Sequence, residues 1–212
     1  MALIGGDFGY RLLRWIHPPG QSHKTDVDEY ESSDHKLKVH FGEDVFERVR
    51  GKTVIDFGCG FGNEAIAYAK HGAERVIGLE LREHLRDKGL EKARQAGVSD
   101  HCTFLESSDI RADIVVSLDS FEHFHHPDQI LELMSDMLKD DGEIWISFGW
   151  SWYHPRGGHR FSVFPWAHLV FSEECLCRWR RDFTTDGATR FHEVDGGLNQ
   201  MTIRRFEQLV KD

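Results

Sequence analysis

Three glycines at alternate positions follow an apolar segment, Val-Ile-Asp-Phe, and are the residues best suited to meet a ligand. They are Gly58, Gly60 and Gly62. Without a side chain, glycine lets the backbone approach a ligand closely and adopt positive φ without strain. A second apolar segment, 76–79, ends at Glu80, whose carboxylate could accept the hydroxyl protons of a ribose. This spacing is typical of a nucleoside-binding turn in an α/β sheet.

Histidine is the second residue type that could do chemistry, since the chain has 14 of them. His123 follows a predicted strand, His159 follows two glycines, and His168 lies among aromatic residues. A neutral imidazole near pH 7 can take a proton from a hydroxyl or an amine. We therefore name these three as candidate catalytic residues, although each could be structural. Glu122 and His123 could simply cap the next helix or bond to the aromatic-rich segment at 149–185.

Strand-like and helix-like segments alternate through the middle of the chain, which indicates a parallel sheet with helices on its faces. The predicted strands are 53–57, 75–80, 102–106, 113–118 and 143–148. The predicted helices are 43–50, 63–71, 82–96, 127–139 and 202–211, and Asp141-Gly142 is read as a turn. We expect the α/β fold class, a Rossmann-like, doubly wound, mostly parallel sheet with helices on both faces and an aromatic-rich cap insertion.

The predicted organisation is a single domain over residues 1–212. Its parts are an N-terminal helical segment at 1–50, a ligand-binding core at 51–148, a cap at 149–185 and a C-terminal segment at 186–212 that could be truncated. Aromatic residues are dense in the cap, where they either form a core under a long loop or line a pocket for a flat or apolar compound.

Composition excludes several classes of function. The formal net charge of -10 argues against a nucleic-acid partner. No apolar run approaches a membrane span, and the basic residues and the break at Pro18-Pro19-Gly20 do not suit a secretory signal. The four cysteines form no C-x-x-C pair, so we expect reduced thiols and a cytoplasmic location. The oligomeric state is left open.

Together these motifs resemble the class I S-adenosylmethionine-dependent methyltransferases, in the branch that acts on small molecules. The resemblance covers residues 50–148 and depends on the glycine turn, on Glu80, on Ser108-Asp109 and on the segment from Asp119 to Pro127. A nicotinamide-binding turn is the distant alternative, because Asn63 stands where that motif has its last glycine.

The resemblance implies S-adenosylmethionine as cofactor, with S-adenosylhomocysteine as product, and a role for each matching residue. Gly58 and Gly60 would contact its methionine part, Asp56 would orient the turn, Glu80 would hold the ribose, Leu81 would pack on the adenine and Asp109 would bind its amino group. The remaining implied cofactor contacts are Cys59, Gly62, Ser108 and Asp119.

Asp119, Glu122 and His123 also resemble the ligand set of methyltransferases that bind a divalent ion beside the substrate. His159 or His168 could add a fourth ligand. Such an ion, whether magnesium, manganese or zinc, would lower the pKa of a hydroxyl without a base.

We therefore expect methyl transfer to a small-molecule acceptor, with a hydroxyl oxygen first and nitrogen or carbon open, by in-line displacement. A non-catalytic nucleoside-binding scaffold and a protein or peptide methyltransferase are the alternatives. The class I sheet ordinarily ends in an antiparallel hairpin. Here that hairpin is absent, truncated or replaced by an earlier segment such as 189–194.

Overall fold

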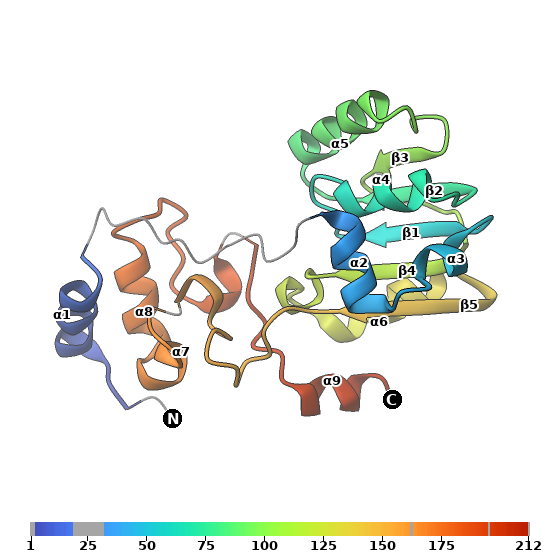
Figure 1. Ribbon diagram of the computed structural model, residues 1–212. Helices are drawn as coiled ribbons and strands as arrows, with labels where there is room; N and C mark the ends of the chain where they lie inside the picture. Colours follow the sequence, from blue (N-terminus) through green and yellow to red (C-terminus); the bar gives the residue numbers. More distant parts are fainter. Residues whose placement is uncertain (1–2, 19–31, 162, 195, 212) are drawn as a thin grey trace. The chain divides into compact units, whose positions relative to one another are not determined.

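The structure is a computed structural model that describes residues 3–18, 32–161, 163–194 and 196–211. Its contacts divide the chain into two compact units (Figure 1). The α/β unit comprises Asp28–Phe121 and Asp128–Phe148, and the second, which we call the helical unit, comprises Met1–Val27, Glu122–Pro127 and Gly149–Asp212. A single domain over 1–212 stays a prediction, and the predicted break at Pro19-Gly20 lies outside the described residues.

Within the described residues, five parallel strands form one sheet in the order β3-β2-β1-β4-β5. Ile55 of the central strand lies opposite Ile77 on one side and Val115 on the other. Because β2 and β4 flank β1 on opposite sides, the carboxyl end of β1 is the switch point where such sheets bind ligands. The strands are β1 (Thr53–Phe57), β2 (Arg75–Leu79), β3 (Cys102–Leu105), β4 (Ala112–Leu118) and β5 (Leu138–Ser147).

Both faces of the sheet are buried against helices. Val54 and Val76 belong to a core that includes side chains of α2 (Ser33–Phe41), α3 (Val45–Val49), α4 (Asn63–Lys70) and α5 (Glu83–Gln95). Ile55 and Ile77 face the other way, into a core with Met134 of α6 (Pro127–Asp136). This double cover explains the continuous apolar strands and confirms the predicted α/β, Rossmann-like fold class.

The start of β5 differs from the sequence-based prediction. Helix α6 ends at Asp136 and the strand begins at Leu138, so the predicted turn at Asp141-Gly142 is wrong. A Cβ on Gly142 would lie 3.1 Å from the carbonyl oxygen of Ala112 and 2.8 Å from Leu138 Cδ2. Glycine therefore permits close strand approach at a point where the β4–β5 register is irregular.

The helical unit has its own aromatic core. Helix α1 (Gly6–Ile16) and α8 (Glu173–Arg180) bury Leu13 and Trp179 in one cluster with Phe161, Phe171 and Phe191, beside the short α7 (Ala167–Val170). Most aromatic residues of the predicted cap are thus core, whereas Tyr153 and Trp166 are exposed. For the buried aromatic residues, the interpretation as a core under a long loop applies, rather than the lining of a pocket.

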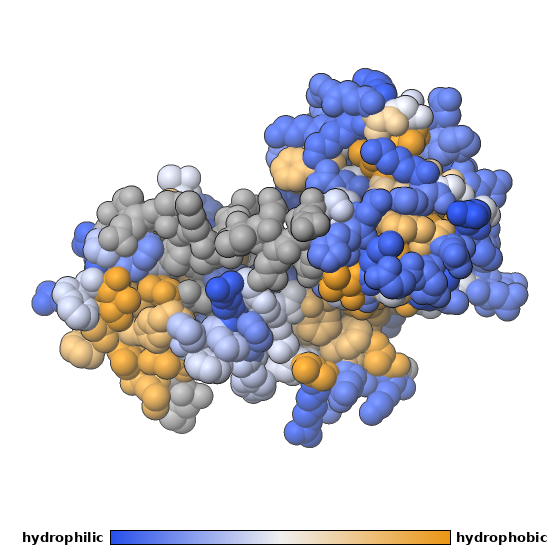
Figure 2. Space-filling model, in the orientation of Figure 1, coloured by the Kyte–Doolittle hydropathy of each residue, from blue (hydrophilic) through white to orange (hydrophobic). Residues whose placement is uncertain are grey.

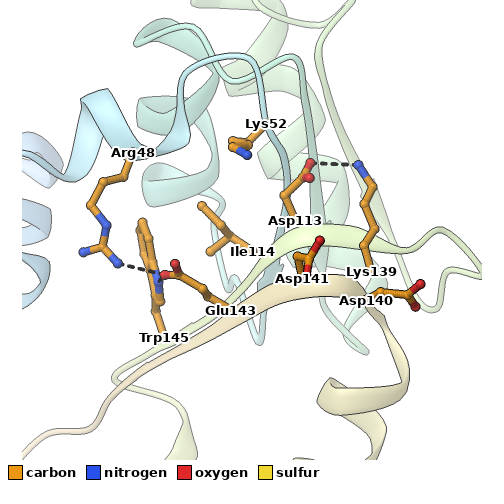
Figure 3. Close-up of a pocket in the computed structure, with 9 residues that line it drawn as sticks. All are labelled: Arg48, Lys52, Asp113, Ile114, Lys139, Asp140, Asp141, Glu143 and Trp145. Carbon is orange, nitrogen blue, oxygen red and sulfur yellow. Dashed lines mark hydrogen bonds and ion pairs between the residues drawn. The ribbon is translucent and has the colours of Figure 1, made fainter.

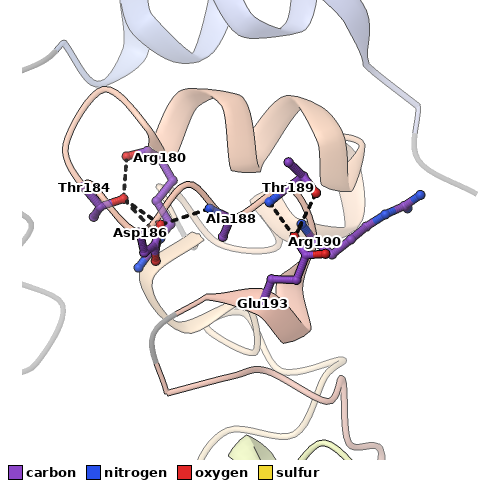
Figure 4. Close-up of polar contacts among 7 residues, drawn as sticks. All are labelled: Arg180, Thr184, Asp186, Ala188, Thr189, Arg190 and Glu193. Carbon is purple, nitrogen blue, oxygen red and sulfur yellow. Dashed lines mark hydrogen bonds and ion pairs between the residues drawn. The ribbon is translucent and has the colours of Figure 1, made fainter.

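Residues 189–194 do not replace a missing strand. Phe191–Glu193 form a 3-10 helix, η3, whose start is capped by Glu193: its carboxylate accepts hydrogen bonds from the Thr189 hydroxyl at 2.8 Å and from the amides of Thr189 and Arg190 (Figure 4). Just before it, Asp186 binds the Arg180 guanidinium and the amide of Ala188. The predicted C-terminal helix is present as α9 (Ile203–Leu209).

The surface of the α/β unit is mostly hydrophilic, with smaller apolar areas (Figure 2). Among the described residues, every helix is too short or too polar to cross a bilayer. All four cysteines carry free, buried thiols.

Candidate active site

The glycine turn has the backbone that its sequence requires. Gly58, Gly60 and Gly62 have φ values of 78°, 53° and 72°, in the left-handed region that favours glycine. The amides of Gly58 and Cys59 donate to the carbonyl of Leu79 at 2.9 and 3.0 Å, which fixes the turn against the end of β2. A Cβ on Gly62 would lie 2.1 Å from the Phe104 ring, whereas a Cβ on Gly60 would meet nothing within 4 Å. Gly62 is thus needed for packing, and Gly60 borders open space.

Glu80 lies beside this turn as a buried carboxylate, 7% exposed. It accepts hydrogen bonds from the Arg82 amide at 3.0 Å and from the Arg82 guanidinium, Nε at 2.9 Å and Nη2 at 3.0 Å. Burial alone would raise the pKa of Glu80, but these bonds and one from the Gly60 amide outweigh it and hold the pKa below its usual value. The site thus presents an ionised acceptor, as a ribose diol requires.

The side chains of Asp56 and Cys59 are buried and uncharged near pH 7. Burial, followed by the repulsion of Glu64, raises the pKa of Asp56 to about 8, while its bond from the Ala65 amide ties β1 to the start of α4. Burial also raises the pKa of the Cys59 thiol far above its usual range, so this sulfur is not a nucleophile.

The residues expected to surround the adenine are Leu81, Ser108 and Asp109, and they have fewer contacts that point to a ligand. Leu81 is 77% exposed and directly follows Glu80, which leaves its side chain open to a planar ligand. Ser108 Oγ accepts a hydrogen bond from the Ile110 amide at 3.1 Å, and Asp109 is exposed. Their adenine contacts stay predictions.

A polar group on the same unit was not foreseen from the sequence. Lys36 of α2 places Nζ 2.9 Å from Asp119 Oδ2 and 3.4 Å from Glu64 Oε1. One turn further along α2, His40 Nδ1 lies 2.6 Å from the hydroxyl of Ser147. The i, i+4 spacing of Lys36 and His40 was the available signal, because it puts both on one helix face.

Charge within this group is balanced by Lys36. Burial alone would lower its pKa, but the carboxylates of Glu64 and Asp119 raise it above its usual value. Burial lowers the pKa of His40, which favours the neutral imidazole. Ser120, another residue not foreseen, donates to the carbonyl of Gly58 at 3.0 Å and links the end of β4 to the glycine turn.

In the helical unit, the structure brings together Glu122, His123 and His159. One potential ligand atom from each lies within 4.8 Å of the others. The two imidazole rings meet edge to face, with centroids 5.2 Å apart. Asp119, which the sequence had grouped with Glu122 and His123, belongs to the α/β unit and pairs with Lys36, and its role as a metal ligand stays a prediction.

Backbone from the C-terminal segment holds this group in place. His123 Nδ1 lies 2.8 Å from the carbonyl oxygen of Gly197, and the Asn199 amide donates to the Glu122 carbonyl at 2.9 Å. Glu122 Oε1 in turn accepts from the Gly149 amide at 2.8 Å. A carbonyl only accepts, so Nδ1 of His123 carries a proton, and in the neutral tautomer the lone pair is on Nε2.

His168 is placed differently from the other two histidines. It is 3% exposed, its Nε2 donates to the carbonyl of Trp152 at 2.6 Å, and its ring packs on that indole. Burial lowers its pKa. These contacts favour a structural role, and a catalytic one stays a prediction.

A cavity of about 530 Å³ lies at the opposite, amino-terminal ends of the strands (Figure 3). Its charges are largely matched: Lys139 contacts Asp113 at 2.8 Å, and Arg48 contacts Glu143 at 2.9 Å. Ligands of parallel sheets bind at the carboxyl ends, so this cavity is not the nucleoside site.

Comparison with known proteins agrees with the fold and the turn. A family model described as "Methyltransferase domain" matches residues 31–186, which is more than half of the chain. The chain therefore belongs to this methyltransferase domain family, and the predicted resemblance to the class I S-adenosylmethionine-dependent methyltransferases is confirmed. The branch that acts on small molecules stays a prediction. The methyl donor implied by that resemblance, S-adenosylmethionine, fits the residues present: an open glycine turn beside an ionised carboxylate.

Curated relatives match over shorter stretches. The ribosomal protein L11 methyltransferase of Photobacterium profundum is 42% identical over 71 residues, or 32% of this chain and 24% of the relative. That of Pectobacterium carotovorum is 33% identical over 103 residues, or 47% of this chain and 34% of the relative. The chain spans about a quarter to a third of the length of these relatives.

Among solved structures, a putative S-adenosylmethionine-dependent methyltransferase of Listeria monocytogenes is 27% identical, with a TM-score of 0.46, over 60% of this chain and 59% of the other. A putative sarcosine dimethylglycine methyltransferase of Galdieria sulphuraria is 19% identical, with a TM-score of 0.49, over 64% and 56%. At these scores the structural comparison adds no evidence on activity.

Proposed function

We propose that this chain catalyses methyl transfer from S-adenosylmethionine to an acceptor. The observation that carries the proposal is the glycine turn at the switch point of the sheet, with the ionised Glu80 against it. Gly60 leaves room for the methionine part of the cofactor, and Glu80 accepts from the ribose hydroxyls. When bound, the cofactor supplies an electrophilic methyl group, and the chain's residues orient it for in-line attack.

The ion pair of Lys36 and Asp119 suits the zwitterionic methionine part of the cofactor. A lysine ammonium matches the α-carboxylate, and an aspartate matches the α-ammonium. Ser120, the residue after Asp119, donates a hydrogen bond to the carbonyl of Gly58. This bond fixes the position of the Lys36–Asp119 ion pair relative to the glycine turn. In this proposal Asp119 binds cofactor rather than metal.

For the acceptor, we propose a small molecule with a hydroxyl group as the first candidate. A hydroxyl must lose its proton during attack, and Glu122, His123 and His159 form the group that we assign to this step. The neutral tautomer of His123 that this bond to the Gly197 carbonyl selects has its lone pair on Nε2, as a base requires. The reduced thiols agree with a cytoplasmic location, which also stays a proposal.

A protein acceptor is the second candidate, and the names of the curated relatives favour it. Those proteins are called ribosomal protein L11 methyltransferases, but their matches cover 32% and 47% of this chain. By analogy an amine of a ribosomal or other protein would take the place of the hydroxyl. The non-catalytic scaffold is the outcome if no acceptor is methylated.

The test uses S-adenosylmethionine labelled in its methyl group. The protein is incubated with a metabolite extract and, separately, with a protein extract, and label transfer is measured in each. Label in small molecules supports the first candidate, and label only in protein supports the second. Calorimetric binding of S-adenosylhomocysteine without any transfer supports the scaffold, and no binding at all rejects the proposed function.

A further inference from the structure

We propose that Glu122, His123 and His159 form a binding site for one divalent transition-metal ion of the zinc class. The potential ligand atoms of the three residues already lie within 4.8 Å of one another, so one ion could contact all three after small side-chain shifts. The metal site suggested by the sequence included Asp119. The ligand atoms that the structure groups are those of Glu122, His123 and His159, one of the two histidines suggested as a fourth ligand.

The donor set selects the kind of ion. One carboxylate and two imidazoles suit zinc and its neighbours in the first transition row, whereas magnesium and calcium prefer several oxygen ligands. Three protein ligands leave a coordination position for an oxygen of water or of a bound molecule. A glutamate and two neutral histidines also leave one positive charge on the complex, which suits an anionic or polarisable ligand.

The contacts around the three side chains resemble the supporting bonds of metal sites. Metal-binding histidines ordinarily donate their second ring nitrogen to a carbonyl or carboxylate, which fixes the tautomer. His123 does so, from Nδ1 to the Gly197 carbonyl at 2.8 Å. Glu122 is 3% exposed, and its Oε1 is oriented by the Gly149 amide.

The backbone is also built closely around this group. A Cβ on Gly149 would lie 2.8 Å from Glu122 Oε1, and a Cβ on Gly197 would lie 2.5 Å from the His123 carbonyl oxygen. His159 itself has a left-handed backbone, with φ of 48°, which is uncommon for a residue other than glycine. Strain of this kind concentrates at functional sites.

Metal binding itself does not depend on the proposed methyl transfer. Its catalytic use does rest on that function: the ion would replace an imidazole as the group that lowers the pKa of an acceptor hydroxyl. The two ideas can therefore fail separately.

The experiment measures Zn²⁺ binding by calorimetry on the full chain after treatment with a chelator, without cofactor or acceptor. We expect one ion per chain. Glu122→Gln and His159→Ala should each weaken binding by at least about ten- to a hundredfold. Co²⁺ is the second probe, because visible absorption of the Co²⁺ form reports nitrogen ligands in a four-coordinate site.

The matched controls are exposed histidines of the same unit. His125 packs against His126 and stacks on His192, with centroids 4.4 and 4.8 Å apart, and could bind zinc on the surface. We expect His126→Ala and His192→Ala to keep full affinity. Thermal unfolding and S-adenosylhomocysteine binding show whether each variant is folded.

Loss of binding in the controls but not in His159→Ala would overturn the proposal. So would the lack of stoichiometric binding by the folded wild-type chain. In that case, Glu122 and the two histidines form a polar group held by hydrogen bonds alone.

Discussion

The guanidinium of Arg82 contacts both carboxylate oxygens of Glu80, with Nε 2.9 Å from Oε1 and Nη2 3.0 Å from Oε2. The Arg82 and Gly60 amides add two more bonds, so about four acceptor positions are already used. A ribose can bind Glu80 only if part of this set gives way. The side chain of Arg82, 52% exposed, is the part that can leave.

The first prediction follows from this competition. Arg82→Ala should bind S-adenosylhomocysteine about two- to fivefold more tightly, because an exposed ion pair contributes at most about 1 kcal/mol. Glu80→Ala should weaken binding by more than tenfold, whereas Glu91→Gln on the exposed face of α5 should not change it. Calorimetry measures all three, and weaker binding by Arg82→Ala would mean that the arginine contacts the cofactor.

The second prediction separates two glycines of one turn. Gly60→Ala should fold with little loss of stability beyond its backbone strain, because its Cβ meets open space, but should lose most cofactor affinity. Gly62→Ala should lower the free energy of unfolding by about 2 kcal/mol more, since its Cβ would overlap the Phe104 ring. Thermal unfolding and calorimetry distinguish the two losses. Equal effects would mean that the turn does not border a ligand.

The third prediction concerns the cation of the polar group. Lys36→Met should lower the free energy of unfolding by about 1–3 kcal/mol, because it leaves Glu64 and Asp119 close together without a counter-charge. It should also weaken cofactor binding. Lys38→Met on the same helix is the control, since its pair with Glu43 is exposed. Denaturant unfolding measures the difference, and equal losses would contradict the role of Lys36.

The fourth prediction is a pH dependence carried by Asp56. Its folded-state pKa of about 8 lies above the ordinary 3.8, so the folded chain keeps a proton that the unfolded chain releases. Stability should therefore fall as pH rises between about 4 and 8, by up to about 1.4 kcal/mol per pH unit from this group. Asp56→Asn imitates the protonated form, and its stability relative to wild type should rise with pH. Parallel curves for the two proteins would refute the assignment.

The fifth prediction tests the support of the histidine group. Gly196 and Gly197 both have positive φ, 87° and 68°, so alanine strains the backbone at either position. Only at Gly197 would the added Cβ also overlap the His123 carbonyl. The free energy of unfolding of Gly197→Ala should thus be about 1–2 kcal/mol lower than that of Gly196→Ala. Gly197→Ala should also lose methyl-transfer activity. Unfolding and activity assays compare the pair, and similar losses would show that the contact with His123 is unimportant.

The local parts of the fold could be predicted from the sequence. Strand β1 has the predicted bounds, because its apolar and β-branched residues and the glycines after it leave no other local choice. At Asp141-Gly142 the same reasoning was wrong, since a glycine that permits close strand approach has the same sequence pattern as one that makes a turn.

The contacts that assemble the candidate site could be predicted only in part. His123 and His159 were named from their neighbours in the sequence, and the structure brings them together. Lys36 was missed because its carboxylate partners are far along the chain and reach it only through the packing of α2 on the sheet. Gly197 was missed because its backbone oxygen, which no sequence pattern identifies, is the contacting atom.

The hydrogen bonds from Glu122 and His123 to residues 197–199 have a consequence for biosynthesis. All strands of the sheet have left the ribosome soon after Ser147 is made, so the parallel sheet of the α/β unit can form early. The segment around Glu122 must wait for about fifty further residues before Gly197 and Asn199 emerge. In a nascent chain, the glycine turn and Glu80 can therefore be in place before Glu122, His123 and His159 are held together.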